Sequence, residues 1–261
     1  MPELPDVEFF RRYIDRTALN RPIRRVHAPR GKALKTTPRK LGQALTARRL
    51  SASRRHGKYL FLQIHHGPWL VLHFGMTGFP RFLHDPDAEP PPHVRLLLTF
   101  EDDTRLAYDD QRMLGRIDLA DDPQRFAARK SLGPDLLDLD LATFRHILAS
   151  RRGTIKAALM NQNLMAGIGN VYSDEILFQA GLHPRRTPAE LDGEHVKHLH
   201  RTALRVLHKA VDFQADPRRA PRDFLLARRH DDHPACPRCS RRLQSEKISG
   251  RTAYYCPSCQ S

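Results

Sequence analysis

The spacing of hydrophobic residues changes along the chain, and the predicted secondary structure changes with it. Near the start, Val7, Phe10 and Ile14 recur at helical intervals, which predicts a helix over 3–16. Short hydrophobic runs separated by polar turns follow, a pattern typical of antiparallel strands. Strands are expected at Ile23–Ala28, Tyr59–Ile64, Trp69–Phe74, Val94–Phe100, Thr104–Tyr108 and Arg116–Ala120. Several strands at such short spacing indicate a β-sandwich or barrel.

The second half of the chain has the hydrophobic spacing of helices. These are expected at Leu141–Ala149, Thr154–Gln162, Val171–Ala180 and about 188–211, before a basic loop at Pro217–Arg222 and a hairpin formed by Gln244–Ile248 and Arg251–Tyr255. The predicted fold class is therefore α+β. We expect four segments: an N-terminal β-sandwich domain at 1–122, a connector at 123–140, a helical domain at 141–225 and a small finger at 230–261.

The charge balance points to a polyanionic partner. Lys and Arg total 44 and Asp and Glu total 29, which gives a formal net charge of +15. Such an excess favours nucleic acid, with a generally basic or ribosome-associated protein as the alternative. No hydrophobic run approaches the roughly 20 residues of a membrane span, and acids at Glu3, Asp6 and Glu8 are not those of a signal peptide. We expect a cytoplasmic monomer without membrane contact.

All four cysteines lie near the C-terminus, in the pattern C-x2-C-x16-C-x2-C formed by Cys236, Cys239, Cys256 and Cys259. Four thiolates at this spacing can bind one zinc ion tetrahedrally. A pair of disulfides is the alternative, but it does not fit a reducing compartment. Because no ligand position stays open, the zinc is expected to be structural. Arg251 begins the returning strand of the hairpin, where a basic side chain can reach a phosphate.

The first residues carry the most reactive chemistry. If Met1 is removed, the nitrogen of Pro2 becomes a free secondary amine, next to the carboxylate of Glu3. An α-amino group has a pKa of about 7.7–8.0, so part of it is neutral at pH 7. A neutral amine can attack a sugar carbon and form an imine, with Glu3 as acid or base. The alternative is that Pro2 only permits methionine removal and Glu3 is a solvated charge.

Other polar turns are candidates for contacts with nucleic acid. Lys58 opens a strand in a basic stretch, and Asn170 follows a glycine-rich turn as a predicted N-cap, where a helix N-terminus can bind an anion. Met76 lies at the tip of the turn His73–Gly78, and Arg112 and Leu114 lie in the turn Asp110–Gly115. An exposed Met or Leu there can wedge between stacked bases. By spacing alone a solvated lysine, an ordinary helical corner and core positions for Met76 and Leu114 remain open.

Together these segments resemble the formamidopyrimidine-DNA glycosylase/endonuclease VIII family of base-excision repair enzymes. The resemblance covers essentially the whole chain. Its most specific parts are the Met-Pro-Glu-Leu-Pro start, Gly57–Leu60, His73–Gly78, Ala166–Glu175 and the four-cysteine finger. It implies an N-terminal β-sandwich behind a catalytic helix, a helix–two-turns–helix domain and a zinc finger, with DNA bound in a cleft between the domains.

The resemblance also implies roles for individual residues. Pro2 would be the nucleophile and Glu3 the general acid/base. Lys58 would contact the phosphate beside the lesion, and Asn170 and Arg251 would hold the flanking phosphates, with Lys58 and Arg251 counted among the catalytic residues. Further DNA-binding positions are His73, Met76, Arg112, Leu114, Lys156 and Glu175, of which Met76, Arg112 and Leu114 would fill the space left by the flipped nucleotide. The chain departs from the family pattern at Asp6, usually glutamate, and at Leu114, usually aromatic in the purine-directed branch.

The implied function is that of a bifunctional DNA glycosylase/AP lyase. It would remove oxidised purines such as 8-oxoguanine and formamidopyrimidines from double-stranded DNA and nick the strand, in the cytoplasm at the nucleoid. Two alternatives remain from the sequence. One is an endonuclease VIII-like preference for oxidised pyrimidines. The other is a non-catalytic zinc-containing DNA-binding protein, which a retained Met1 would require because the Pro2 nitrogen would then be an amide.

Overall fold

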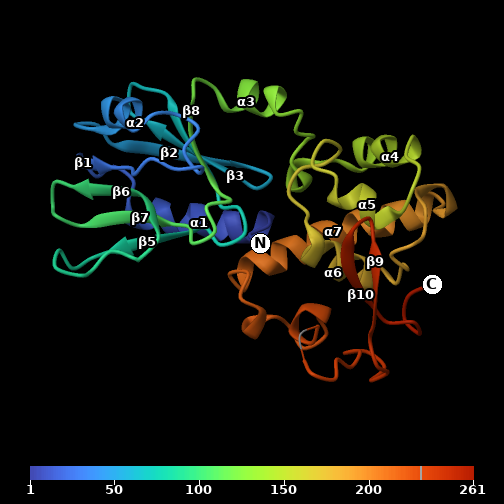
Figure 1. The fold of residues 1–261 in the computed structure, drawn as a ribbon. Coiled ribbons are helices and arrows are strands. Elements are labelled where there is room, and N and C mark those ends of the chain that lie inside the picture. Colours follow the sequence, from blue (N-terminus) through green and yellow to red (C-terminus); the bar gives the residue numbers. More distant parts are fainter. Residues whose placement is uncertain (230) are drawn as a thin grey trace. The chain divides into compact units, whose positions relative to one another are not determined.

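The computed structural model of the protein describes residues 1–229 and 231–261. The chain forms two compact units. The first contains Met1–Pro2 and Asp6–Ser131, and the second contains Glu3–Pro5 and Leu132–Ser261. The predicted α+β class is confirmed, with antiparallel sheets in the first unit and mainly helices in the second (Figure 1). Residue 230, where the predicted finger begins, lies outside the described residues.

The first unit is built from two four-stranded antiparallel sheets. One has the order β1-β6-β7-β5 and the other β2-β3-β4-β8. Their bounds are β1 Ile23–His27, β2 Leu50–His56, β3 Tyr59–Ile64, β4 Trp69–His73, β5 Phe79–Leu83, β6 Val94–Phe100, β7 Arg105–Asp109 and β8 Arg116–Ala120. Helix α1, Leu4–Thr17, contributes Val7, Phe10 and Ile14 to the core that both sheets share. The helical stripe predicted from the sequence is therefore buried as expected.

Three elements of the first unit have weak sequence patterns and were not predicted. They are α2 (Pro38–Leu45), β2 and β5. In β2 only Leu50 is buried, and most of the partly or fully exposed positions after it carry polar or charged side chains. Strand β5 contains Pro80, and proline is uncommon within strands, so the sequence did not indicate a strand here. Helix α3, Pro123–Arg129, completes the unit with an N-cap bond from Arg125 to Asp122.

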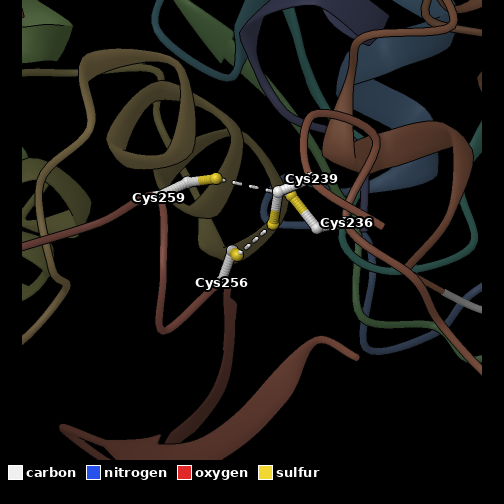
Figure 2. Close-up of side chains that lie close together, drawn as sticks. All are labelled: Cys236, Cys239, Cys256 and Cys259. Atoms are coloured by element: carbon white, nitrogen blue, oxygen red, sulfur yellow. Dashed lines mark hydrogen bonds between the residues drawn. The ribbon is translucent and has the colours of Figure 1, made fainter. Parts of the chain in front are cut away.

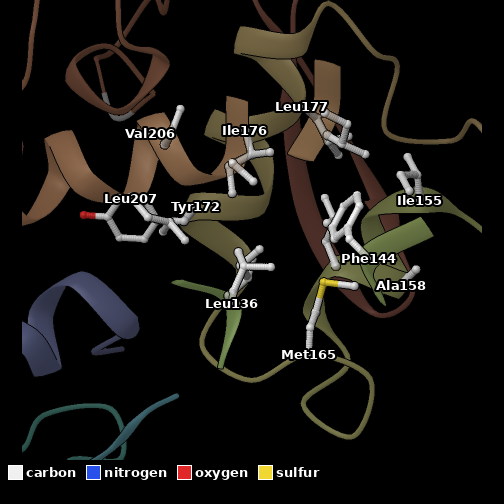
Figure 3. Packing of buried hydrophobic residues seen from close by; sticks show 14 of the residues in the cluster. Leu136, Phe144, Ile155, Ala158, Met165, Tyr172, Ile176, Leu177, Val206 and Leu207 are labelled. Atoms are coloured by element: carbon white, nitrogen blue, oxygen red, sulfur yellow. The ribbon is translucent and has the colours of Figure 1, made fainter. Parts of the chain in front are cut away.

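The second unit packs its helices around one hydrophobic core (Figure 3). The α-helices are α4 Leu141–Ala149, α5 Ile155–Met160, α6 Asn170–Ala180 and α7 Gly193–Asp212, and the short 3-10 helices are η1 Leu136–Asp138, η2 Pro188–Glu190, η3 Pro217–Arg219 and η4 Leu225–Ala227. Figure 3 shows Phe144, Met165, Tyr172 and Leu207 in this core, contributed by separate segments. The predicted helix at about 188–211 is interrupted, since Asp192 caps a new helix at Gly193.

A two-stranded ribbon completes the second unit. Strands β9, Gln244–Ile248, and β10, Arg251–Tyr255, pair antiparallel across Ser249 and Gly250, as the sequence predicted. Strand β10 packs against α6 (Figure 1). None of the helices in the described part of the chain combines the length and the hydrophobicity that a membrane span requires.

Candidate active site

The carboxylate of Glu3 is bound by the N-terminal turn of helix α6. It accepts hydrogen bonds from the backbone N–H groups of Gly169 at 2.6 Å, Val171 at 2.9 Å and Tyr172 at 3.2 Å. Glu3 is only 2% exposed. A helix N-terminus has unpaired N–H groups and a positive dipole end, so a carboxylate is favourable there. The predicted anion site at this turn therefore holds a carboxylate of the chain itself.

The sequence predicted Asn170 as the N-cap of α6, and this prediction is wrong. Gly169 occupies the N-cap position and Asn170 is the first helical residue. Gly169 has no side chain to cap the helix, and the carboxylate of Glu3 accepts the N–H groups of Val171 and Tyr172 in its place. This frees the amide of Asn170, which donates to the carbonyl of Thr252 on β10 at 3.0 Å.

The backbone beside Glu3 is also fixed to the second unit. Leu4 donates its N–H to the carbonyl of Gly167 at 3.0 Å, and its side chain lies in the core of that unit. Pro2, directly before Glu3, is partly exposed. Residues 3 and 4 are therefore held rigidly by their hydrogen bonds, while the position that would carry the amine nucleophile stays accessible.

Lys58 and His73 are the predicted DNA contacts on strands β3 and β4 of the first unit and the turn before them. Lys58 follows Gly57 in the turn between β2 and β3 and is 7% exposed. Burial, together with the charges of Lys58 and Arg116, lowers the pKa of His73 to about 4. Its Nδ1 accepts the N–H of Gly75 at 3.2 Å, which leaves the proton of the neutral ring on Nε2. His73 can therefore contact a phosphate as a neutral donor, whereas Lys58 carries a charge.

Two turns of the first unit present exposed hydrophobic side chains. Met76 is 43% exposed and Leu114 is 50% exposed, so neither is a core residue. The turns pack closely: Gly75 has a φ of +57°, and a Cβ there would lie 2.4 Å from the carbonyl carbon of Leu114. Arg112, also exposed, donates its N–H to Thr77 Oγ1 at 3.1 Å. Exposed Met and Leu side chains on a rigid support suit insertion into a base stack.

Asp110 is the residue that joins these turns, and it was not singled out from the sequence. Its buried carboxylate accepts the hydroxyl of Thr77 at 2.7 Å and the N–H of Gly115 at 2.7 Å. The only sequence signal was its place at the start of the polar turn.

Lys156 and Glu175 were predicted to contact DNA, and the structure corrects this. Lys156 is 0% exposed, with its Nζ 2.5 Å from Asp174 Oδ1, and Glu175 is 1% exposed. Glu175 accepts the N–H of Leu226 at 2.7 Å and an amide N–H of Gln179 at 2.9 Å. Burial raises the pKa of Glu175 to about 7. Neither side chain reaches the surface, because each binds groups inside the second unit.

The four cysteines form a site that fits zinc (Figure 2). Their sulfur atoms all lie within 4.8 Å of one another, with Cys236 and Cys259 at 3.8 Å and Cys239 and Cys256 at 3.5 Å. Tetrahedral zinc with Zn–S bonds of about 2.3 Å requires S–S distances of roughly 3.8 Å. One structural zinc ion, bound by four thiolates, therefore fits this cluster. Arg251 lies exposed at the start of β10.

Comparisons with known proteins agree with this arrangement. Three protein-family models match the chain. Residues 1–117 match the formamidopyrimidine-DNA glycosylase N-terminal domain, and residues 132–220 match the formamidopyrimidine-DNA glycosylase H2TH domain. Residues 235–261 match the zinc finger found in FPG and IleRS. Formamidopyrimidine-DNA glycosylases of Geobacter metallireducens and Pelobacter propionicus are 34% and 32% identical, each over 100% of both chains.

Solved structures show the same similarity. A complex of the Lactococcus lactis Fpg with abasic-site DNA has a TM-score of 0.90 at 30% identity, and the match covers 99% of each chain. A complex of MutM with DNA containing carbocyclic 8-oxo-G also has a TM-score of 0.90 at 30% identity, over 100% of each chain. The resemblance suggested by the sequence motifs is confirmed: the chain belongs to the formamidopyrimidine-DNA glycosylase family.

Proposed function

We propose that this protein is a base-excision repair DNA glycosylase with AP lyase activity, in which Pro2 is the nucleophile and Glu3 the general acid/base. The observation that carries the proposal is the Glu3 carboxylate, bound by three backbone N–H groups of α6 directly beside Pro2. A carboxylate fixed in this way is oriented before substrate binds, which is what a proton-transferring group requires. An ordinary surface glutamate would not be buried and bound by three backbone N–H groups.

The chemistry follows from these two residues. With Met1 removed, the nitrogen lone pair of Pro2 attacks C1′ of the damaged nucleotide, and the base leaves with the electrons of the glycosidic bond. The Glu3 carboxylate takes the N–H proton that Pro2 loses when its bond to C1′ forms, and it gives this proton to the ring oxygen of the sugar as the ring opens, which leaves an iminium ion between Pro2 and C1′. The iminium acidifies the proton on C2′. Loss of that proton expels the 3′ phosphate and nicks the strand, and water then releases Pro2.

The remaining residues of the predicted site are proposed to bind and bend the duplex. Lys58, His73, Asn170 and Arg251 bind phosphates, which position DNA without reading its sequence. Met76, Arg112 and Leu114 fill the space left when the damaged nucleotide is flipped out, which offsets part of the cost of unstacking. The exposure of Met76 and Leu114 on two interlocked turns supports this role. The net charge of +15 supports work on chromosomal DNA at the nucleoid.

Oxidised purines are the proposed substrates. Curated relatives over the full chain are formamidopyrimidine-DNA glycosylases, and similar solved structures hold DNA with an abasic site, a substituted formamidopyrimidine or carbocyclic 8-oxo-G. The endonuclease VIII-like preference for pyrimidines is not favoured by these relatives. The structural zinc supports the ribbon that carries Arg251 and takes no part in the chemical steps.

Borohydride trapping tests this function. The protein mixed with abasic-site duplex and borohydride should give a covalent adduct, and a protein extended by one residue before Pro2 should give none. Pro2→Gly keeps an amine with different basicity and geometry, so it should trap far less. Undiminished trapping by the extended protein would indicate a lysine nucleophile instead. Intact mass identifies whether Met1 is retained, and matched duplexes with 8-oxoguanine or an oxidised pyrimidine test the substrate preference.

A further inference from the structure

The second unit contains a buried ion pair that the proposed mechanism does not use. Lys156, on α5, and Asp174, on α6, are both fully buried, with Nζ and Oδ1 2.5 Å apart. Arg229 lies 3.3 Å from the other oxygen of Asp174 and is 4% exposed. Burial lowers the pKa of Lys156 and raises the pKa of Asp174, and each charge opposes the shift of its partner. Such pairs stabilise a fold little compared with apolar side chains, so a different role is expected.

Asp174 and Asn170 together bind one edge of the zinc ribbon. They are one helical turn apart and lie on the same face of α6. Asn170 donates to the carbonyl of Thr252, and Asp174 Oδ2 accepts the N–H of Tyr254 at 3.2 Å. Thr252 and Tyr254 are alternate residues of β10, whose other edge pairs with β9. Two helix side chains thus take the place of a third strand and fix the backbone next to Arg251.

Lys156 connects this contact to the turn that binds Glu3. Its ammonium group donates to the backbone carbonyl of Asn170 at 3.2 Å and to Ser173 Oγ at 2.9 Å, besides Asp174. The carbonyl of Asn170 belongs to the peptide whose N–H, on Val171, binds Glu3 at 2.9 Å. One planar peptide group is therefore held on one side by Lys156 and binds Glu3 on the other.

We propose that Lys156 and Asp174 are positioning residues, a buried pair that keeps the Glu3-binding turn of α6 in register with the ribbon strand that carries Arg251. The inference rests on the proposed function, because it gives Glu3 and Arg251 their catalytic and phosphate-binding roles. A displacement of about 1 Å in a catalytic group can slow a reaction about 100-fold. The pair therefore contributes to rate through Glu3, without contacting the substrate.

Lys156→Met is the sharpest test, because it removes the ammonium group and leaves no unpaired charge. The carboxylate of Asp174 still has the guanidinium of Arg229 as its partner, so the two remaining buried charges balance. We expect the variant to bind zinc and remain folded. Its single-turnover excision rate at saturating DNA should fall about 10- to 100-fold, with a smaller change in affinity. Hydrogen exchange at the amides of 169–172, measured without DNA, should become faster. Asp174→Asn should show the same changes if it folds, although it leaves two buried cations.

Arg185→Met is the matched control. Arg185 forms an exposed ion pair at 2.7 Å with Glu246 of β9, which also joins the helical part of the unit to the ribbon, but away from the Glu3-binding turn. The control should keep the parental rate and exchange. A folded Lys156→Met protein with parental rate and exchange would overturn the inference, as would an equal loss of rate in Arg185→Met. If the parent protein itself forms no trapped adduct with abasic DNA, the proposed function is wrong. Hydrogen exchange in Lys156→Met and the parent would still test whether Lys156 holds the Glu3-binding turn.

Discussion

Leu4 and Gly167 are in contact through both backbone and side chain. The N–H of Leu4 donates to the carbonyl of Gly167 at 3.0 Å, and a Cβ placed on Gly167 would lie 2.4 Å from Leu4 Cδ1. Gly167 has a φ of +124°, a region that residues with side chains rarely adopt. Glycine is thus required here on two grounds, and the residue it contacts is bonded directly to Glu3.

Gly167→Ala should therefore impair catalysis as well as stability. The new methyl group would displace Leu4 or strain the turn, at a cost on the order of 1–3 kcal/mol. We expect a lower melting temperature and, at a temperature where the variant is folded, a slower single-turnover excision rate. Gly42→Ala is the control, because a Cβ on Gly42 meets no atom within 4 Å and α2 should become slightly more stable. Parental rate in Gly167→Ala would show that Leu4 does not transmit its position to Glu3.

Zinc removal should unfold the ribbon and spare the first unit. The small cluster around the cysteines includes Leu225, Leu243 and Phe178, which is too little apolar surface to hold the ribbon without metal. Chelation should release one zinc per chain and lower DNA affinity. Trp69, the single tryptophan, lies in β4 of the first unit, so its emission should not change. A zinc-free protein that binds DNA as tightly as the parent would contradict this.

Glu175 should make stability depend on pH near neutrality. Burial raises its pKa from 4.5 to about 7, with Asp223 adding a smaller effect in the same direction. A carboxyl group with a raised folded-state pKa contributes stability that is complete below pH 4.5 and is lost as pH rises through 7. Between pH 6 and 8.5 the free energy of unfolding should fall by about 1 kcal/mol from this group.

Urea unfolding of the parent and of Glu175→Gln at both pH values provides the measurement. The variant has no carboxyl group to ionise at this position, so the fall between the two pH values should be smaller by about 1 kcal/mol. The test compares how the free energy of unfolding changes with pH, and not its absolute value. The amide of Glu175→Gln also alters the hydrogen bond with Gln179, which changes the absolute stability at both pH values. Equal pH dependence in both proteins would show that Glu175 does not titrate in this range.

The sequence predicted well those elements that bury a regular hydrophobic pattern. Strands β3, β6 and β8, helix α4 and both ribbon strands have the predicted bounds. Strand β2 was missed because most of its side chains are polar or charged and only Leu50 is buried, so hydrophobic periodicity is weak there. The cysteine spacing predicted the cluster because four local ligands need little tertiary information.

The sequence did not predict the surroundings of the buried charged residues in the candidate site. Lys156 and Glu175 were interpreted as DNA contacts because they match a basic and an acidic position of the family pattern, and such a match does not show whether a side chain is buried. Their partners, Asp174 and the N–H of Leu226, come from other turns and segments, which periodicity does not bring together. Likewise, nothing in the local sequence indicated that Glu3 would take the N–H groups of a helix more than 160 residues away.

The proposed phosphate contacts differ in charge, and salt should distinguish them. Lys58→Ala and Arg251→Ala each remove one cation, so each should reduce the slope of log affinity against log salt by about 0.9. Asn170→Ala and His73→Ala should weaken binding with little change in slope. Asn170 is neutral, and the pKa of His73 near 4 keeps its ring neutral at pH 7 in the free protein. The measurement is a salt titration of binding to undamaged duplexes of different sequence.

Rates at saturating DNA then separate Lys58 from Arg251. Lys58 is proposed to bind beside the lesion, so its loss should also slow excision of bound substrate, whereas loss of Arg251 should affect mainly affinity. His73 offers an internal check, since the charge of Lys58 helps to lower its pKa. In Lys58→Ala the imidazole should titrate at higher pH, which NMR can follow in the free protein. If both Lys58→Ala and Arg251→Ala keep the parental salt slope, neither side chain contacts phosphate, and the proposed clamp must be abandoned.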